Sequence, residues 1–320
     1  MHPKITVIIP AYNAQSTICR AVDSALNQKN VEIEVIVIND CSQDFTQGIV
    51  NLRYSQNESV KLFKTHTNSG PSAARNIGIE KACGSWIAVL DADDWFASGR
   101  LSALLNSALE YKLDFVADSY YLCRDLGISL YLARFTTLSE PGTVMQFSTE
   151  SFVRLGLGSV KPLIKKAFLE RTSIQFDPSV WRGEDLLFYV TLLLNKARFG
   201  LLNTPLYIRS ETPHSLTKSN KVKFLSDLLE VFEELQIRAI AASNDNNELI
   251  KALQYRANVV KDSLAAARWQ SWLKNNGNKR RPNLSSLLNA MRHLLLRKKR
   301  FPISSATDLH DLNDQNISHI

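Results

Sequence analysis

Short apolar, β-branched runs alternate with amphipathic helical segments over about the first 120 residues of the chain. Runs of this kind are typical of strands that are buried on both faces. Strands are expected at residues 5–9, 35–38, 60–63, 86–90 and 115–117. Helices are expected between them at about residues 17–26, with Ser16 as the cap, 72–82 and 100–109. The alternation predicts an α/β fold with a doubly wound, mostly parallel sheet and right-handed crossovers.

The fourth expected strand runs directly into three carboxylates, Asp91, Asp93 and Asp94. Carboxylates at the carboxyl end of a parallel strand lie where open α/β sheets bind ligands. Three like charges this close repel one another unless a cation joins them, and hard oxygen ligands favour Mg²⁺ or Mn²⁺. The run is a candidate metal site facing a diphosphate, and the alternative is a polar turn that caps the following helix.

Polar residues also follow the first two strands, and together they predict a nucleotide-sized crevice at one sheet edge. Tyr12 can stack on a nucleobase, and Asp40 can accept a hydrogen bond from a base N–H. The alternative is that Tyr12 packs in its loop and Asp40 caps a turn with Ser42. Arg75, in the first turns of a helix, can neutralise a phosphate or form a surface salt bridge. This half lacks Gly-x-Gly-x-x-Gly and Gly-x-x-x-x-Gly-Lys-Ser/Thr, which argues against a dinucleotide enzyme and a P-loop NTPase.

The composition is that of an ordinary globular protein. The 320 residues, 45% of them hydrophobic, suit one large domain or a domain with an appendage. No apolar run is long enough to span a bilayer and the first residues lack a signal-peptide pattern, so a cytoplasmic protein is expected. The four scattered cysteines are expected to be reduced thiols. A net charge of +7 fits an anionic substrate, an acidic lipid surface or nucleic acid without choosing among them.

Four segments, in this order and spacing, resemble the family 2 glycosyltransferases with a GT-A fold. The segments are Ile8-Ile9-Pro10-Ala11-Tyr12-Asn13, Val37-Ile38-Asn39-Asp40-Cys41-Ser42-Gln43-Asp44, Asn68-Ser69-Gly70-Pro71-Ser72-Ala73-Ala74-Arg75-Asn76-Ile77-Gly78 and Leu90-Asp91-Ala92-Asp93-Asp94. Gly183-Glu184-Asp185 is similar to the family's acidic catalytic motif. Within the family, the Asp-Cys-Ser and Gly-Pro-x-x-Ala-Arg-Asn motifs are most similar to those of bacterial exopolysaccharide enzymes of the succinoglycan type. One departure is Asn39, where many relatives carry an acid.

The resemblance implies how the donor nucleotide binds. The implied nucleotide-binding residues are Pro10, Tyr12 and Asp40 at the uracil of a UDP-sugar, Arg75 at the nucleotide and Asp91 at the ribose.

The resemblance also implies the metal and the catalytic residues. Asp93 would ligate Mn²⁺ or Mg²⁺, and His214 is a candidate further ligand or else a surface residue. Asp185 would be the catalytic base, with Glu184 beside it positioning the acceptor. The alternative is that Glu184 and Asp185 have a purely structural role, because acids in the first turn of a helix interact favourably with the helix dipole. Trp181 is either a platform for the acceptor sugar or a packed core residue.

The predicted domain organisation separates a sheet domain from a helical region. The expected boundaries are 1–219 for the GT-A domain (nucleotide-binding half 1–118, acceptor-binding half 119–219), 220–303 for a helical C-terminal appendage and 304–320 for a polar tail.

Near the C-terminus, residues 284–295 carry an apolar stripe that is followed by Arg297-Lys298-Lys299-Arg300. A basic amphipathic helix of this kind can lie on an anionic membrane surface. The alternative is a helix packed on the protein, with its charges in solvent.

The resemblance implies an inverting, metal-dependent glycosyltransferase that moves a sugar from a UDP-sugar to a glycan acceptor, in bacterial exopolysaccharide, capsule or lipopolysaccharide synthesis. The acceptor is expected to be lipid-linked, with peripheral contact to the cytoplasmic face of the inner membrane and no nucleic-acid partner. One alternative is a sugar nucleotidyltransferase, although residues 10–13 do not supply its Gly-rich phosphate loop. Another is a non-catalytic nucleotide-sugar-binding relative, against which the retained acids argue. The basic cluster lacks interleaved aromatics, which argues against single-strand binding.

Overall fold

The computed structural model describes residues 4–124, 129–132, 139–210, 220–242 and 246–274. Contacts divide the chain into two compact units, Met1–Thr212 and Pro213–Ile320. His214, the stripe at 284–295 and the expected tail at 304–320 lie outside the described residues. Among the residues described, no helix combines the length and apolar character needed to cross a bilayer.

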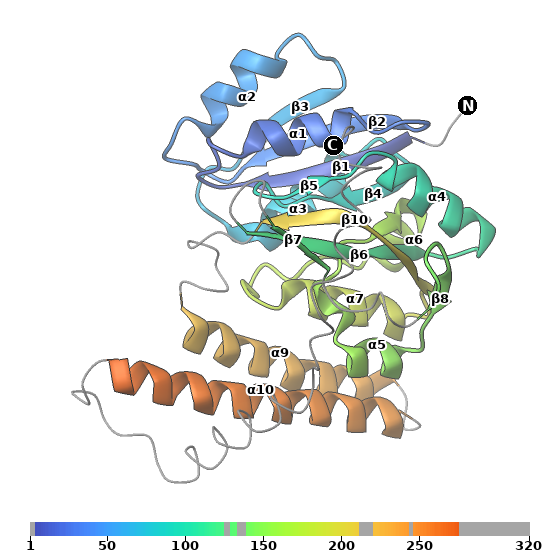
Figure 1. The fold of residues 1–320 in the computed structure, drawn as a ribbon, viewed down its shortest axis with the longest axis vertical. Coiled ribbons are helices and arrows are strands. Elements are labelled where there is room, and N and C mark those ends of the chain that lie inside the picture. Colours follow the sequence, from blue (N-terminus) through green and yellow to red (C-terminus); the bar gives the residue numbers. More distant parts are fainter. Residues whose placement is uncertain (1–3, 125–128, 133–138, 211–219, 243–245, 275–320) are drawn as a thin grey trace. The chain divides into compact units, whose positions relative to one another are not determined.

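Strands and helices alternate along the first unit (Figure 1). The strands are β1 (Lys4–Ala11), β2 (Glu32–Asn39), β3 (Val60–Lys64), β4 (Trp86–Val89), β5 (Trp95–Phe96), β6 (Phe115–Arg124), β7 (Ser129–Leu132), β8 (Val144–Gln146), β9 (Leu163–Lys165) and β10 (Phe199–Ser210). The helices are α1 (Ile18–Leu26), α2 (Thr46–Tyr54), α3 (Gly70–Lys81), α4 (Arg100–Glu110), α5 (Thr149–Leu155), α6 (Lys166–Thr172) and α7 (Glu184–Leu194), with a 3₁₀ turn, η1 (Leu157–Ser159).

These strands form one sheet in the order β3-β2-β1-β4-β9-β6-β10-β5, with β7 beside β6 and β8 beside β10. The pairs β3–β2, β2–β1 and β1–β4 are parallel, and so is β6–β10. Strand β9 is antiparallel to both of its neighbours, β4 and β6. The predicted fold class is confirmed, and the carboxyl ends of β1, β2 and β4 meet at one edge as expected.

Helices cover the sheet on both faces because alternate strand residues point in opposite directions. Val7 and Val35 belong to a buried cluster that includes Val22 of α1 and Leu104 of α4. The residue after Val7, Ile8, points to the other face, where α3 lies. A Cβ added at Gly78 of α3 would lie 2.4 Å from the Ile8 side chain. Glycine therefore lets α3, which carries Arg75, lie directly on β1.

Two local predictions are wrong. The first strand does not end at residue 9, before Pro10, because β1 continues to Ala11. The Ile8 carbonyl accepts from Leu90 and the Ala11 carbonyl accepts from Asp40, so the Pro10 nitrogen is on the β4 side, beyond the last pair of that ladder. A missing N–H costs little there. Ser16 is not the cap of α1 either, since the cap position is Thr17 and makes no side-chain cap hydrogen bond.

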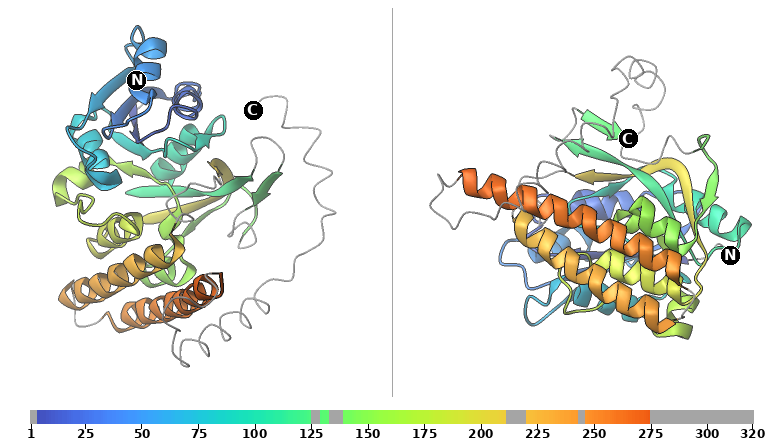
Figure 2. Two further views of the ribbon diagram at one scale, coloured as in Figure 1. Left: turned by 90° about the vertical axis from the view of Figure 1, so that its left-hand side faces the viewer. Right: turned by 90° about the horizontal axis from the view of Figure 1, so that it is seen from below.

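The second unit contains two long helices, α9 (Lys221–Ala242) and α10 (Asn247–Lys274), in the region that was expected to be helical. They pack side by side along their lengths (Figure 2). Buried residues of α9 include Val231, Phe232 and Leu235, which lie at helical spacing on one face.

Candidate active site

Loops that follow β1 and β2 are joined to each other by side chains. Asn13 has a positive φ of 51°, donates its backbone N–H to Ser42 Oγ and accepts from the Gln43 N–H. The turn after β2 is capped by Asn39, whose Oδ1 accepts from the Ser42 N–H. The alternative that Asp40 caps this turn with Ser42 is therefore wrong. Asn39, the departure from the family pattern, does so instead.

Asp40 is buried and holds the start of α3. Its Oδ1 accepts from Thr65 Oγ1 at 2.8 Å and from the Ser69 N–H at 2.9 Å, and its Oδ2 accepts from the Gly70 N–H at 2.8 Å. Backbone N–H groups at a helix start need acceptors, and a carboxylate also complements the helix dipole. Nearby, Tyr12 is 47% exposed, so its ring is open to solvent rather than packed in its loop.

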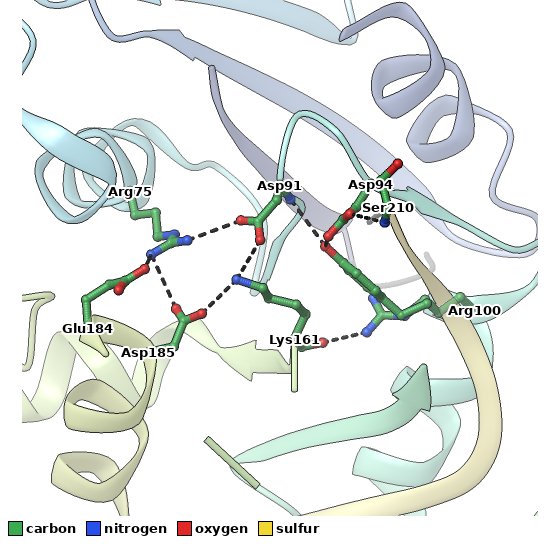
Figure 3. A network of polar contacts seen from close by, with 9 residues as sticks. Arg75, Asp91, Asp94, Arg100, Lys161, Glu184, Asp185 and Ser210 are labelled. Carbon is green, nitrogen blue, oxygen red and sulfur yellow. Dashed lines mark hydrogen bonds and ion pairs between the residues drawn. The ribbon is translucent and has the colours of Figure 1, made fainter. Parts of the chain in front are cut away.

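Arg75 is the centre of a charge cluster, shown in Figure 3. Its guanidinium lies 2.8 Å from Glu184 Oε1, 3.1 Å from Asp91 Oδ1 and 3.3 Å from Asp185 Oδ1. The side chain is only 3% exposed, so the alternative of a surface salt bridge is wrong. The ring of Phe176 lies 5.2 Å from the guanidinium carbon. The structure thus brings together Arg75, Asp91, Glu184 and Asp185 from three separate elements.

A lysine that the sequence analysis did not single out completes the cluster. Lys161 Nζ lies 2.7 Å from Asp185 Oδ2 and 2.9 Å from Asp91 Oδ2. Burial would lower the pKa of this ammonium, but Asp185 and Asp91 outweigh burial and raise it. Lys161 lies in a short connection between η1 and β9, where a single lysine carries no pattern that distinguishes it from a surface residue.

The acids of the cluster differ in their electrostatics. Burial would raise the pKa of Asp91, but the charges of Lys161 and Arg75 outweigh it and hold that pKa well below its usual range. Glu184 behaves oppositely, because burial and the charge of Asp185 raise its pKa despite Arg75. Asp91 is therefore a permanent anion at neutral pH.

The carboxylates of Asp93 and Asp94 have different surroundings and therefore different roles. Asp94 is buried, and its carboxylate accepts from Tyr207 Oη at 2.6 Å and from the Ser210 N–H at 2.7 Å. It therefore ties the acidic loop to β10. Burial and the charge of Asp91 raise the pKa of Asp93. Its backbone carbonyl accepts from Arg20 of α1 at 2.6 Å, a contact that fixes the loop but not the carboxylate.

The residues present can be tested for their fit to a divalent cation. Within the described residues, no group of three His, Cys, Asp or Glu side chains could enclose a metal ion. The charges of Arg209 and Lys161 lower the pKa of Asp93, but burial and the charge of Asp91 outweigh them. Mg²⁺ and Mn²⁺ commonly use one or two protein carboxylates, with substrate phosphates and water completing the shell. A carboxylate whose pKa is raised by burial and by a neighbouring acid fits such an ion.

Trp181 lies on the backbone at the start of α3. A Cβ added at Gly70, whose φ is +82°, would lie 3.2 Å from the Trp181 indole. The side chain is 46% exposed, so the alternative of a packed core residue is wrong. The segment before α7 is joined to α3 by two further contacts. Ser72 Oγ donates to the Val180 carbonyl, and the Asn76 amide pairs with both backbone groups of Phe176. These contacts bring Gly183-Glu184-Asp185 to Arg75.

Comparison with known proteins decides the family. Residues 6–170, more than half of the chain, match the model of the family described as glycosyl transferase family 2. The chain belongs to glycosyl transferase family 2. The resemblance expected from the sequence is confirmed, and membership favours a glycosyltransferase over the nucleotidyltransferase alternative.

Two curated relatives and one solved structure illustrate the similarity of this family 2 glycosyltransferase to known proteins. Succinoglycan biosynthesis protein ExoO of Rhizobium meliloti is 33% identical over 199 residues, 60% of this chain and 56% of ExoO. The GalNAc(5)-diNAcBac-PP-undecaprenol beta-1,3-glucosyltransferase of Campylobacter jejuni is 35% identical over 109 residues, 34% of this chain and 35% of the relative. The chain spans about half to two thirds of the length of the first curated relatives that it matches. The crystal structure of S. aureus TarS 1–349 with UDP-GlcNAc has a TM-score of 0.65 at 22% identity, covering 91% of this chain and 79% of that one, and so shares the fold.

Proposed function

We propose that this glycosyltransferase moves a sugar from a UDP-sugar to a hydroxyl group of a bacterial glycan, with inversion at the anomeric carbon. The observation that carries the proposal is the link between the acid that follows β4 and the acid that opens α7, made through Arg75 and Lys161. Donor and acceptor chemistry require charged groups on two sides of one sugar. The UDP-GlcNAc bound to TarS and the succinoglycan role named for ExoO support the donor and product classes.

For the donor, we propose that residues 1–118 form the nucleotide-binding half. The proposed contacts are Pro10, Tyr12 and Asp40 at the uracil, Arg75 at the nucleotide and Asp91 at the ribose. Support for the base site comes from the exposed ring of Tyr12, which leaves a π-face free for stacking. Asp40 already accepts three hydrogen bonds, so it would reach a uracil imide through the remaining lone pair on Oδ2.

For the metal, Asp93 would hold Mn²⁺ or Mg²⁺, and His214 is a further candidate ligand. When bound, such an ion supplies positive charge that stabilises a departing diphosphate. The guanidinium of Arg75 contributes positive charge of its own, in an environment that excludes most of the water.

For the chemical step, Asp185 is the proposed base. The acceptor oxygen bonds to the anomeric carbon as the bond from that carbon to the UDP oxygen breaks, and UDP keeps the electron pair. Asp185 takes the acceptor proton. One base and one displacement invert the anomeric centre. Residues 119–219 would form the acceptor half, with Glu184 and Trp181 positioning the acceptor, and the exposed indole suits a sugar face.

The test is a screen of nucleotide sugars with and without Mn²⁺, read as UDP release with a glycan acceptor. We expect a UDP-sugar to be consumed by the wild-type protein. Asp185→Asn should bind UDP normally and transfer sugar at least about 100-fold more slowly. Glu170→Gln, which alters an exposed acid outside the cluster, is the control. Wild-type transfer by Asp185→Asn would contradict the base assignment, and failure to bind any UDP compound would contradict the donor class.

The acceptor is proposed to be lipid-linked, which would place the protein on the cytoplasmic face of the inner membrane. The undecaprenol-linked substrate in the name of the Campylobacter relative supports this, together with the basic sequence after residue 284. Transfer to an undecaprenyl-diphosphate glycan should exceed transfer to the free glycan. Binding to anionic vesicles should fall at high salt and after removal of residues 284–320. Equal transfer to both acceptors, or salt-independent binding, would contradict these two points.

A further inference from the structure

The charges around Arg75 close into a ring. Arg75 approaches Oδ1 of both Asp91 and Asp185, whereas Lys161 approaches Oδ2 of both, as Figure 3 shows. Each of these two carboxylates is thus held by two different cations through its two different oxygens. A carboxylate whose two oxygens are each paired with a different cation cannot rotate about its Cβ–Cγ bond without breaking an ion pair. The ring therefore fixes the plane of Asp185 relative to Asp91.

The backbone of Lys161 is fixed by contacts with its neighbours, and this fixes the point from which the ammonium reaches the acids. Its carbonyl accepts from Arg100 Nη2, and the same guanidinium pairs with Asp118. Asp118 Oδ2 also accepts from the Leu206 N–H of β10. Before Lys161, η1 packs so closely against α7 that a Cβ added at Gly158 would lie 2.6 Å from the Leu186 side chain. The lysine backbone is therefore anchored to α4, β6 and α7.

Burying the charged Lys161 side chain at this position has a desolvation cost. Lys161 is 8% exposed, and burial of an ammonium is unfavourable unless close anions compensate for it. Arg75 alone would already give Asp91 and Glu184 a counter-charge, through contacts of 3.1 and 2.8 Å. What Lys161 adds is a second contact on Asp185 and the bridge from that acid to Asp91. Lys161 therefore contributes mainly to the position of the Asp185 carboxylate and less to the stability of the fold.

We propose that Lys161 is a positioning residue for sugar transfer, which orients the Asp185 carboxylate toward the acceptor and couples it to Asp91 on the donor side. This inference rests on the proposed function of Asp185 as the base. Asp185 Oδ1 is buried, so the acceptor would approach Oδ2, whose lone pair outside the contact with Lys161 has a fixed direction once the plane of the group is fixed. Loss of the ammonium frees the plane, while Arg75 continues to hold Asp91 and Glu184.

The experiment compares Lys161→Met, Lys161→Gln and Lys161→Arg with Lys165→Met, an exposed lysine four residues on. The rate constant kcat and the KM for the donor are measured with Mn²⁺, and UDP affinity is measured by calorimetry. Lys161→Met and Lys161→Gln should lower kcat by about 100-fold, as expected for a misplaced base, and change UDP affinity by less than about threefold. Lys161→Arg should recover about tenfold of the loss because it keeps a cation. Lys165→Met should match the wild type. Lys161→Gln keeps a hydrogen-bond donor, so it remains a usable variant if Lys161→Met does not fold.

A second measurement does not depend on transfer. In protein with ¹³C-labelled aspartate carboxyls, Asp185→Asn assigns the Asp185 signal, which should move in Lys161→Gln and stay in place in Lys165→Met. Wild-type kcat in Lys161→Gln, an equal loss of UDP affinity and kcat, or an unmoved Asp185 signal would each overturn the proposal. A wild-type protein that binds UDP and transfers no sugar would contradict the proposed function, and the carboxyl signal would still show whether Lys161 holds the Asp185 carboxylate.

Discussion

The guanidinium of Arg100 and the carboxylate of Asp118 lie 2.7 Å apart, and neither side chain has any exposed surface. Removing one member of a buried pair leaves the other charge uncompensated. Arg100→Met should therefore lower the free energy of unfolding by about 3–5 kcal/mol in chemical denaturation. Arg154→Met is the matched control, because it removes an arginine from an exposed pair with Glu150 and should cost less than about 1 kcal/mol. Equal losses would show that Asp118 does not depend on Arg100.

The pair can also be removed as a whole. Arg100→Met combined with Asp118→Leu should be more stable than Arg100→Met alone, because no charge is then left buried. A double variant as unstable as the single one would mean that the cost of Arg100→Met comes from the Lys161 carbonyl or from packing against Phe96 and Tyr207, or that the Leu206 N–H needs Asp118 as its acceptor.

Glu34 gives stability that depends on pH. Burial would raise the pKa of its carboxyl, but hydrogen bonds from Lys61, Thr6 and the Cys83 backbone outweigh burial and lower the pKa to about 2. Because the folded pKa lies below the ordinary value of 4.5, the stabilisation is complete above pH 4.5 and is lost as pH falls toward 2. Glu34→Gln should cost on the order of 2–3 kcal/mol at pH 7 and almost nothing near pH 2.

Glu32 provides the control on the same strand. Its carboxylate is exposed and lies 3.5 Å from Lys4, so Glu32→Gln should change the unfolding free energy by less than about 1 kcal/mol at every pH. Denaturation curves recorded from pH 2 to pH 7 give both differences. A Glu34→Gln difference that does not change with pH would show that the carboxyl is not ionised by its partners.

Gly70 and Gly142 share a φ of +82° but differ in their surroundings, since nothing lies within 4 Å of a Cβ added at Gly142. Alanine at either position should cost about 1 kcal/mol or slightly more, because a side chain disfavours left-handed backbone. Gly70→Ala alone should also shift the fluorescence of Trp181, which must move away. Trp181→Phe identifies that component of the emission. A Trp181 signal that does not change in Gly70→Ala would contradict the contact.

Asp93 is expected to account for the effect of metal on UDP binding. Calorimetry of the wild type should show tighter UDP binding with Mn²⁺ than with a chelator. Asp93→Asn should lose at least about tenfold in affinity with Mn²⁺ and nothing with the chelator. Glu80→Gln, at an exposed acid, should behave as the wild type. UDP affinity that is equal with and without metal in the wild type would remove the role proposed for Asp93.

Much of the fold was predictable because buried parallel strands produce uninterrupted apolar runs. Strands β1 to β4 and helices α3 and α4 all follow from such local signals. Helix α2 and strand β9 do not, since β9 has three residues and α2 buries only Thr46, Val50 and Tyr54. A three-residue strand placed antiparallel between β4 and β6 depends on tertiary pairing, which local periodicity does not encode.

The site was predictable where motifs carried it and not where single residues did. Asp91, Arg75 and Glu184 were named from the sequence, and the structure joins them through contacts of 3.1 and 2.8 Å. Lys161 and Arg100 were missed because a buried cation is recognised only by the anions that surround it. Those anions lie at distant positions in the sequence, such as Asp185 for Lys161 and Asp118 for Arg100.

The ring of charges can form only at a late stage of chain synthesis, because its residues lie far apart in the sequence. Arg75 precedes Glu184 by 109 positions, and the family match ends at residue 170, before either acid of α7. A nascent chain of 170 residues holds Arg75 and Lys161 with Asp91 as their only counter-charge within the ring. The buried charges of Arg75 and Lys161 therefore lack part of their compensation until the acids of α7 are available. Released fragments that end at residue 194, the end of α7, should resist proteolysis better than fragments that end at residue 170.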